Sequence, residues 1–333
     1  MADKIFGIPY DEEIFVNAWQ SEPDMASLAL LQSGVMVDDP IVAGAIGTDS
    51  NFYTIPFYNI LGGDAANYDG ATDVPITETS GDFQSGIVYG RTKGWKARDF
   101  VRDMTSGDPL GHIARSVARY WAKQRHNILL SVLDGIFGIT DFATSNVQDI
   151  AASHTTQVKM GETTLADLAV DTMGENADAY SVVIMHSTVA HNLAKLQLLD
   201  YEKGVDGLAL QNGLRLARLH GMTVIIDDRV PVDRTTVGFP KYSTYMLGQG
   251  VLRKASGSLL VPVEPYRDPI RNGGEEGIIT RIRETVHPNG FSFAKPVSGF
   301  TGSPTNIQLA TADNWSLEYP GSALPLAKVI TNG

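Results

Sequence analysis

Histidine, serine and aspartate side chains lie close together in one part of the sequence, and these are the residue types of hydrolase sites. His186 and Ser187 directly follow an apolar run, and Asp200 comes shortly after them. Ser187 lacks the surrounding G-x-S-x-G turn that exposes the nucleophile in α/β-hydrolases. We therefore expect Ser187 to cap the helix that follows it, by accepting a hydrogen bond from a backbone N–H group.

Two further sets of residues have the chemistry of metal ligands. His186 and His191 are five positions apart, a spacing that does not place both on one helix face as in H-E-x-x-H sites. Asp227 and Asp228 follow a second apolar run, where a carboxylate pair can bind magnesium. No phosphate-binding glycine loop accompanies them, and acids at a strand end are typical of turns. The sequence predicts no catalytic site, no metal site and no cofactor.

The elements that would position these residues form a strand–helix–strand unit. Apolar strands are predicted at Tyr180–Met185 and Met222–Ile226, with a helix over 187–199 between them. This order is typical of a compact α/β domain. Further elements are expected as a helix at 165–173, capped by Thr163 or Thr164, and as strands at 242–247 and 259–263. Alternation over 277–285 predicts a half-exposed strand, and 286–293 should complete a hairpin through Pro288-Asn289-Gly290.

The strongest helix signal begins at Asp108, which can cap the first N–H groups, with Pro109 in the first turn. Apolar residues then recur at three- and four-residue spacing as far as Ile136. Gly135 and Gly138 are expected to end the helix. Its length would be about 40 Å at 1.5 Å per residue, so we predict a spine that runs through the fold.

The segment before this helix has the pattern of an extended flap. Phe52–Tyr58 is aromatic and β-branched, and Pro56 restricts it to an edge or irregular strand. Strands are expected at 74–79 and 85–92, with a turn at 80–82. A two-stranded flap of this kind buries too little apolar surface to be stable alone. A short amphipathic helix is also expected at 24–31.

Charge is distributed unevenly along the chain. Residues 1–90 contain fourteen acidic residues and one basic residue, Lys4, whereas residues 91–126 contain nine bases and three acids. These two segments are either solvated surfaces or, alternatively, complementary surfaces through which neighbouring copies associate. The net charge of −12 is unlike that of nucleic-acid-binding proteins. We name the following bases the basic belt and predict that they form an assembly surface: Arg91, Lys93, Lys96, Arg98, Arg115, Arg119, Lys123 and Arg125.

Composition sets further limits on the class of protein. The chain has 333 residues and no cysteine, which excludes disulfides and thiolate chemistry. The N-terminus has no apolar run of signal-peptide length, and no run of about 18 apolar residues predicts a transmembrane helix. We therefore expect no membrane association.

The order of these elements resembles the major capsid proteins of tailed bacteriophages, which have the Hong Kong 97-like fold. Several short stretches carry the resemblance to a siphophage subgroup of these coat proteins. They are Phe52-x-x-Ile55-Pro56-Phe57-Tyr58-Asn59, Lys93-Gly94-Trp95-Lys96-Ala97-Arg98-Asp99, Gly107-Asp108-Pro109, Tyr120-Trp121, Val183-Ile184-Met185-His186-Ser187 and Val224-Ile225-Ile226-Asp227-Asp228. Together they span most of the chain, roughly from Asn51 to Phe293.

The resemblance implies an α+β fold with four parts. Residues 1–50 would be an N-terminal arm and 51–106 an extended loop, the E-loop. A peripheral domain with the spine helix would comprise 107–164 and 264–298. An axial domain of α/β type would comprise 165–263 and 299–333. The family's isopeptide cross-link is not carried over, because no residue here matches its lysine or asparagine.

The resemblance also implies a function. Copies would assemble as hexamers and pentamers into an icosahedral virion capsid, formed in the host cytoplasm, that encloses double-stranded DNA without binding it specifically. Scaffolding, portal and decoration proteins would be its partners. Two alternatives stay open: an encapsulin-like shell that encloses an enzyme, and an α/β hydrolase that uses His186, Asp227 and Asp228.

Overall fold

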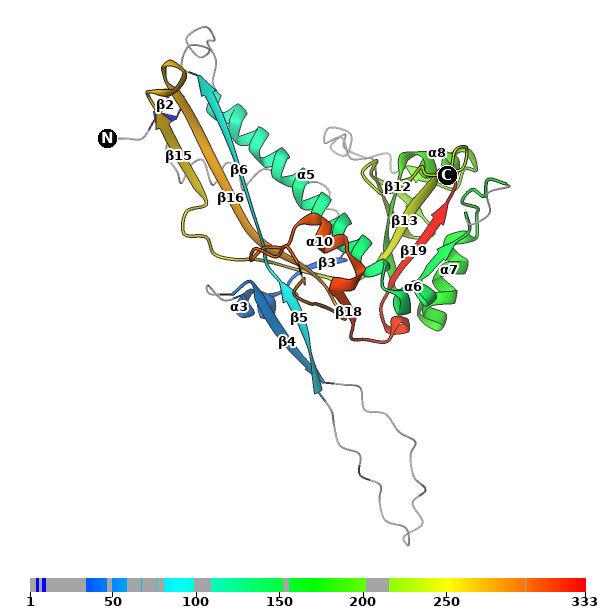
Figure 1. Ribbon diagram of the computed structural model, residues 1–333. Helices are drawn as coiled ribbons and strands as arrows, with labels where there is room; N and C mark the ends of the chain where they lie inside the picture. The colour runs from blue at the N-terminus through cyan, green and yellow to red at the C-terminus, as the bar shows by residue number, and fades with distance from the viewer. Residues whose placement is uncertain are drawn as a thin grey trace.

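The computed structural model describes residues 4–5, 8–9, 34–46, 50–58, 67, 76, 81–98, 109–151, 156–201, 216–296 and 298–333. Its main parts are an eight-stranded sheet with helices, a five-stranded sheet with one long helix beside it, and a hairpin that projects below both (Figure 1). The expected α+β class is confirmed. The predicted helix at 24–31 lies outside the described residues.

The eight-stranded sheet has the order β7-β19-β13-β8-β11-β10-β9, with β12 paired to β13. Its strands β8 (Tyr180–Met185) and β11 (Met222–Ile226) have the predicted bounds and pair in parallel, and helix α8 (Ser187–Lys195) follows β8. The predicted strand–helix–strand unit is therefore confirmed. The other strands are β7 (Val147–Asp149), β9 (Asp200–Tyr201), β10 (Leu216–Leu219), β12 (Val232–Asp233), β13 (Lys241–Gly248) and β19 (Leu326–Thr331).

This sheet is buried on both faces because a different apolar cluster covers each one. Val183 of β8 packs in the cluster that includes α7 (Thr164–Met173) and α8. Ile184, the next residue, points to the opposite face and packs in the cluster that includes the second half of α5 (Pro109–Phe137). Both side chains are fully buried. Alternate side chains of one strand thus join two layers of the core.

Helix α5 confirms the predicted spine. Its 29 residues extend about 44 Å at 1.5 Å per residue, and it lies alongside the five-stranded sheet in Figure 1. It ends at Phe137, just before Gly138. Gly135 does not end the helix, contrary to the prediction: it lies inside α5, where a Cβ atom would be 2.2 Å from the carbonyl oxygen of Leu309. This glycine allows α10 (Asn306–Ala310) to approach closely.

The five-stranded sheet is built around β16 (Glu275–Pro288), which pairs with three strands. Along most of its length it pairs with β6 (Tyr89–Arg98), and on its other side with β15 (Val263–Asp268) and then β14 (Leu252–Ser256). The predicted alternation is confirmed: Ile278, Thr280 and Ile282 are buried, whereas Ile279, Arg281 and Arg283 are partly exposed. The fifth strand is β3 (Met36–Asp38), parallel to β14.

Two strand predictions near this sheet are wrong. Residues 259–262 are not in a strand, and Leu260 is 99% exposed, because the chain there only connects β14 to β15. The hairpin predicted through Pro288-Asn289-Gly290 does not form either. The turn is present, with Gly290 at φ +86°, but it directs β17 (Phe291–Phe293) to pair with β18 (Trp315–Leu317) and not with β16.

The predicted flap is represented by β4 (Phe52–Tyr58) and β5 (Gly81–Ile87), which form a two-stranded antiparallel sheet. The edge-strand prediction for β4 is confirmed. The predicted turn at 80–82 is wrong for Gly81 and Asp82, which belong to β5. The predicted strand at 85–92 is interrupted at Val88, because β5 and β6 pair with different partners. Of the predicted strand at 74–79, only Ile76 is described, and it is not in a strand.

Short elements complete the described chain. The α7 prediction is confirmed within one residue of its start. The remaining elements are β1 (Lys4–Ile5), β2 (Ile8–Pro9), α3 (Pro40–Ala45), α6 (Thr140–Asn146) and the 3₁₀ segments η1 (Gly174–Ala179), η2 (Arg271–Gly273), η3 (Ala312–Asn314) and η4 (Gly321–Ala323). No single described helix is long and apolar enough to span a membrane; α5 and α6 pass that test only as a pair, bent by 93°.

Candidate assembly surface

The histidine and serine that follow β8 have roles in capping α8. His186 has extended backbone and is the N-cap, because its Nδ1 accepts a hydrogen bond from the Thr188 N–H (3.1 Å). Ser187 is the first helical residue, and its own N–H donates to Oδ1 of Asp228 (3.1 Å). The prediction that Ser187 is the cap is therefore wrong by one position. The predicted end of this helix at 199 is also wrong, since α8 ends at Lys195.

The sequence also places Asp200 shortly after His186 and Ser187, but the sheet does not bring Asp200 and His186 together. Asp200 lies in β9, three strands away from β8, a separation of about 14 Å at the usual spacing of strands. His186 instead has Asp228 as its nearest acid, with 3.7 Å between Nε2 and Oδ1, and the Asp228 side chain is 69% exposed. A grouping of His186, Ser187 and Asp200 is therefore not assembled here.

Asp227 and Asp228 do not form a paired metal site, because their side chains have different partners. Oδ2 of Asp227 lies 2.5 Å from Nε2 of His126 and 2.8 Å from Nη2 of Arg229. Burial alone would raise the pKa of Asp227, but the contacts with His126 and Arg229 outweigh it and hold this pKa well below its usual range. Within the described ranges, no group of three or more His, Asp or Glu side chains could hold a metal ion.

Three members of the basic belt are engaged inside the chain. Arg91 donates to the carbonyl oxygen of Pro304 (2.7 Å) and to Oδ1 of Asn306 (3.0 Å). Lys96 forms an ion pair with Glu275 (2.9 Å), although over half of its own side chain remains exposed. The third, Arg125, is paired within the fold. These contacts attach β6 to the 303–306 segment, and both β6 and α5 to β16.

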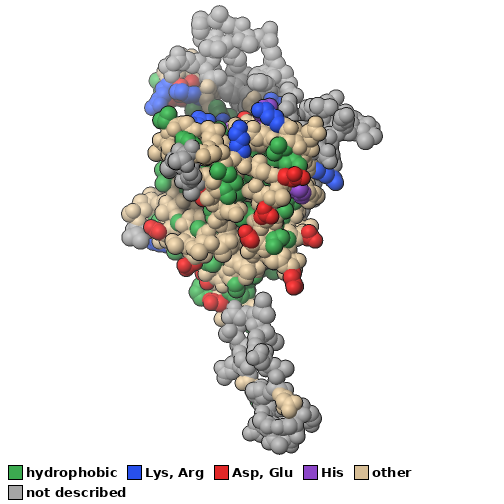
Figure 2. Space-filling view, turned by 90° about the vertical axis from the view of Figure 1, so that its right-hand side faces the viewer, with side chains coloured by type: hydrophobic (Ala, Val, Ile, Leu, Met, Phe, Trp, Pro, Cys, Tyr) green, Lys and Arg blue, Asp and Glu red, His purple; other side chains and the backbone are tan. Residues whose placement is uncertain are grey.

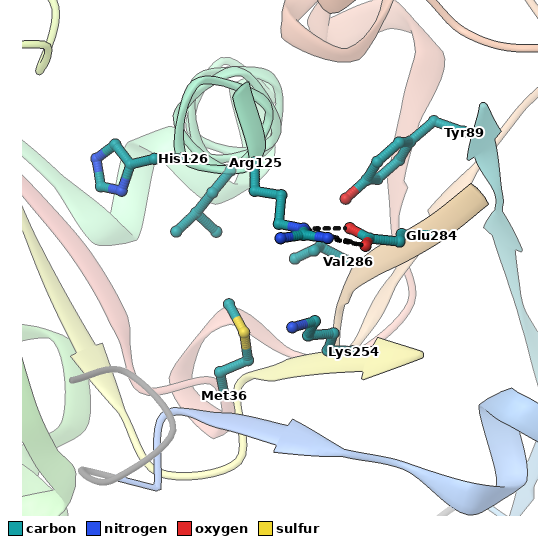
Figure 3. Close-up of a pocket in the computed structure, with 8 residues that line it drawn as sticks. Met36, Tyr89, Arg125, His126, Lys254, Glu284 and Val286 are labelled. Carbon is teal, nitrogen blue, oxygen red and sulfur yellow. Dashed lines mark hydrogen bonds and ion pairs between the residues drawn. The ribbon is translucent and has the colours of Figure 1, made fainter. Parts of the chain in front are cut away.

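Arg125 points inward from α5 to a small pocket between the helix and the five-stranded sheet (Figure 3). Its guanidinium donates to both carboxylate oxygens of Glu284, with distances of 2.6 to 3.0 Å, and the Glu284 side chain is only 8% exposed. Tyr89 and Lys254 line the same pocket. A bidentate pair of this kind fixes both distance and orientation, so Arg125 contributes to the fold more directly than to an outer surface.

Three other belt members are exposed in the described chain. They are Lys93 on β6 and Arg119 and Lys123 on α5. Arg98 and Arg115 have described backbone, but their side chains lie outside the description. The predicted assembly surface stays a prediction, and among the side chains that the structure describes, those of Lys93, Arg119 and Lys123 are available for it.

An acidic surface is present on another side of the molecule. Figure 2 shows the side on which α7 lies, with Asp and Glu side chains over its middle and lower parts and Lys and Arg side chains nearer its upper end. Helix α7 and the 3₁₀ segment η1 contribute four exposed acids, which are Asp167, Asp171, Glu175 and Asp178. The chain thus carries surfaces of opposite sign on separate elements.

Comparison with known proteins supports a common origin and fold with phage capsids. No family model matches the chain. The major capsid protein of Bacillus phage SPP1 is 27% identical over 294 residues, which is 87% of each chain. The capsid of Ralstonia phage GP4 superposes with a TM-score of 0.58 at 10% identity, covering 90% of this chain and 87% of the other. The structure of Mycobacterium phage Bobi gives 0.52 at 11% identity, covering 92% and 90%.

Over most of its length the chain is similar to a phage major capsid protein. The capsid fold expected from the sequence is confirmed, and the role of this capsid protein is structural and not enzymatic. The open alternatives, an encapsulin-like shell and a hydrolase, receive no support from the relatives described above.

Sequence reasoning missed the acidic partners of the belt. Glu275 and Glu284 lie on β16 and hold Lys96 and Arg125 within the capsid protein. The alternation of β16 contained a signal for Glu284. Counting every second residue from the buried Ile278, Thr280 and Ile282 reaches Glu284, which therefore lies on the same buried face of the strand. A glutamate on a buried face requires a basic partner. That partner is on α5, more than 150 residues earlier in the chain.

Proposed function

We propose that this capsid protein assembles as hexamers and pentamers into an icosahedral shell that encloses double-stranded DNA. The observation that carries the proposal is the similarity to the SPP1 major capsid protein over 87% of both chains. The structural likeness to the Ralstonia phage GP4 capsid supports it for the fold. Assembly takes place in the host cytoplasm, with scaffolding, portal and decoration proteins as partners.

In this proposal the four parts of the chain have separate tasks. Residues 1–50 are the N-terminal arm and 51–106 the E-loop, with 107–164 and 264–298 as the peripheral domain and 165–263 and 299–333 as the axial domain. The division into a five-stranded and an eight-stranded sheet supports two domains. Strand β14 pairs with β16, so its residues extend the peripheral domain beyond the predicted boundary.

The β4–β5 hairpin is the part that most needs a neighbour. It is a two-stranded sheet, and such a sheet is marginal alone in water. Tyr58, at the end of β4, is 88% exposed, and Phe83 on β5 is 57% exposed. Exposed aromatic side chains on one projecting element are typical of a surface that a partner covers. We assign that partner as an adjacent copy of the chain.

Charge contributes in two ways. A net charge of −12 per copy repels phosphate, so the shell encloses DNA without holding it tightly. The exposed belt residues Lys93, Arg119 and Lys123 bind acidic surfaces of adjacent copies, including the acid-rich first 90 residues. Association through such contacts weakens as salt screens them.

Sedimentation velocity of the purified protein, with and without a scaffolding protein, tests the proposed function. We expect a fast-sedimenting species with the mass of a closed shell. A protein that stays monomeric at high concentration, even with scaffold, contradicts the proposal.

The belt is tested separately by reversing Arg115, Arg119 and Lys123 to glutamate. We expect the yield of shells to fall at least tenfold while the circular dichroism and melting temperature of the monomer stay those of the wild type. Reversal of two exposed bases elsewhere, Lys195→Glu and Arg234→Glu, is the control. Wild-type shell yield from the belt variant would show that these bases are only solvated.

A further inference from the structure

Helix α5 is fastened to the eight-stranded sheet by two polar contacts eight residues apart. At the first, Nε2 of His126 lies 2.5 Å from Oδ2 of Asp227, which directly follows β11. Both side chains are almost fully buried, at 3% and 9% exposure. Arg229 binds the same carboxylate (2.8 Å), and its Nη1 donates to the carbonyl oxygen of Lys123 (3.5 Å). The first contact therefore engages the helix through a side chain and through its backbone.

At the second contact the carboxylate lies on the other partner. Here the helix supplies the acid: Oδ1 of Asp134 accepts a hydrogen bond from the Tyr245 hydroxyl on β13 (2.7 Å). Nζ of Lys328, on β19, lies 3.6 Å from the same oxygen and over the Tyr245 ring. At the first contact the acid comes from the sheet side, and at the second it comes from the helix.

These contacts add directional constraints to the apolar packing between them. Ile128, Val132 and Ile136 join α5 to the core, but apolar burial is non-directional and tolerates small rotations. The Asp227 carboxylate is almost fully buried and loses much of its stabilisation when its partners move away, because water is excluded from the contact, whereas Asp134 is 31% exposed. Two such contacts, about 12 Å apart along the helix, fix both its rotation and its axial position.

Helix α5 also connects the two large parts of the molecule. In Figure 1 its first half lies beside the five-stranded sheet and its second half reaches the eight-stranded sheet. Trp121 of α5 donates to Thr280 of β16 (3.0 Å), so the helix is held to the five-stranded sheet as well. The orientation of α5 on the eight-stranded sheet therefore determines the angle between the two sheets.

We propose that the contact between His126 and Asp227 sets this angle, and through it the curvature of the shell. The inference rests on the proposed function, since it concerns an assembled particle. In a closed assembly each copy is rotated by a fixed amount relative to the next, and a small change in subunit shape changes how the assembly closes. If the contact between His126 and Asp227 is lost, α5 can rotate about the remaining contact of Asp134 with Tyr245 and Lys328.

The test compares two adjacent substitutions, Asp227→Asn and Asp228→Asn, in the full chain assembled under identical conditions. Asp227→Asn removes the charge held by His126 and Arg229, whereas Asp228 is 69% exposed and makes no contact with α5 among those described. Particle diameters are measured by cryo-electron microscopy. We expect at least one new size class, or open sheets and tubes, for Asp227→Asn, and the wild-type diameter for Asp228→Asn.

The outcomes separate the inference from the proposed function. If the wild-type protein forms shells and Asp227→Asn forms shells of the same diameter, the inference is overturned and the proposed function stays intact. Absence of any wild-type shell would overturn the proposed function itself. If Asp227→Asn does not fold, as judged by circular dichroism, His126→Gln decides the matter, because it changes the same contact from the helix side. A normal diameter for His126→Gln would again overturn the inference.

Discussion

The central strands of the two sheets are stabilised in different ways. Strand β8 is short and apolar, and from Val182 to Met185 it is fully buried. Strand β16 has fourteen residues and carries buried titratable groups. Of the five Glu and His residues that are buried in the described chain, four belong to β16: Glu275, Glu276, Glu284 and His287.

This difference separates two kinds of stability in one chain. The contacts of β8 are apolar and non-directional, so they depend on volume and hardly on pH. The contacts of β16 depend on specific charged partners on other elements, and a lost partner leaves a buried group uncompensated. The contacts of β8 should therefore depend little on charge or acid, and those of β16 should respond strongly to both.

The largest effect is expected from Glu284→Gln. This change removes the charge that compensates the partly buried Arg125, and breaking such a pair costs about 3–5 kcal/mol. Urea denaturation of the unassembled protein measures the change in the free energy of unfolding. The double variant Arg125→Met, Glu284→Leu is the control and should recover most of the loss. A loss below about 1 kcal/mol, as at surface pairs, would contradict the role given to this pair.

Acid should weaken the five-stranded sheet through His287. Burial, helped by the charge of Arg253 and opposed by Asp39, lowers the pKa of His287 to about 3. The histidine is neutral in the fold but takes up a proton near pH 6.5 when unfolded, so stability is complete above pH 6.5 and falls as the pH drops toward 3. The loss is roughly 3 kcal/mol between pH 6.5 and 4. Unfolding free energies at several pH values should show a smaller slope for His287→Gln, and an identical slope would count against the assignment.

A smaller change is expected in the eight-stranded sheet from Ile184→Val. This substitution removes one methylene group from a fully buried side chain and should cost about 1 kcal/mol. The cost should be the same at pH 7 and pH 4, because no charge is involved. A cost that grows in acid would remove the distinction drawn between the two sheets.

The smallest effect is expected at an exposed ion pair of the five-stranded sheet. Nη2 of Arg281 lies 2.6 Å from Oε2 of Glu264, but the Glu264 side chain is 50% exposed. Glu264→Gln should therefore change the free energy of unfolding by less than about 1 kcal/mol. An effect as large as that of Glu284→Gln would show that burial does not separate the two pairs.

The same difference explains what the sequence could predict. Both β8 and β11 were predicted to the residue, because apolar runs with turn residues at their ends are local signals. The strand at 259–263 and the hairpin through Gly290 were wrong, because pairing in that region depends on partners distant in sequence, such as β18 for β17. The basic belt was visible as a charge pattern, but its division into paired and exposed members was not. That division depends on Glu275 and Glu284, which lie about 150 or more residues away from their partners.

Cryo-electron microscopy of the assembled protein tests the central claim most directly. The account predicts a closed icosahedral shell built from rings of six and five copies, with the β4–β5 hairpin of each copy lying on an adjacent copy. Particles whose hairpins contact only their own chain, or a protein that forms no shell under any assembly condition, would contradict it.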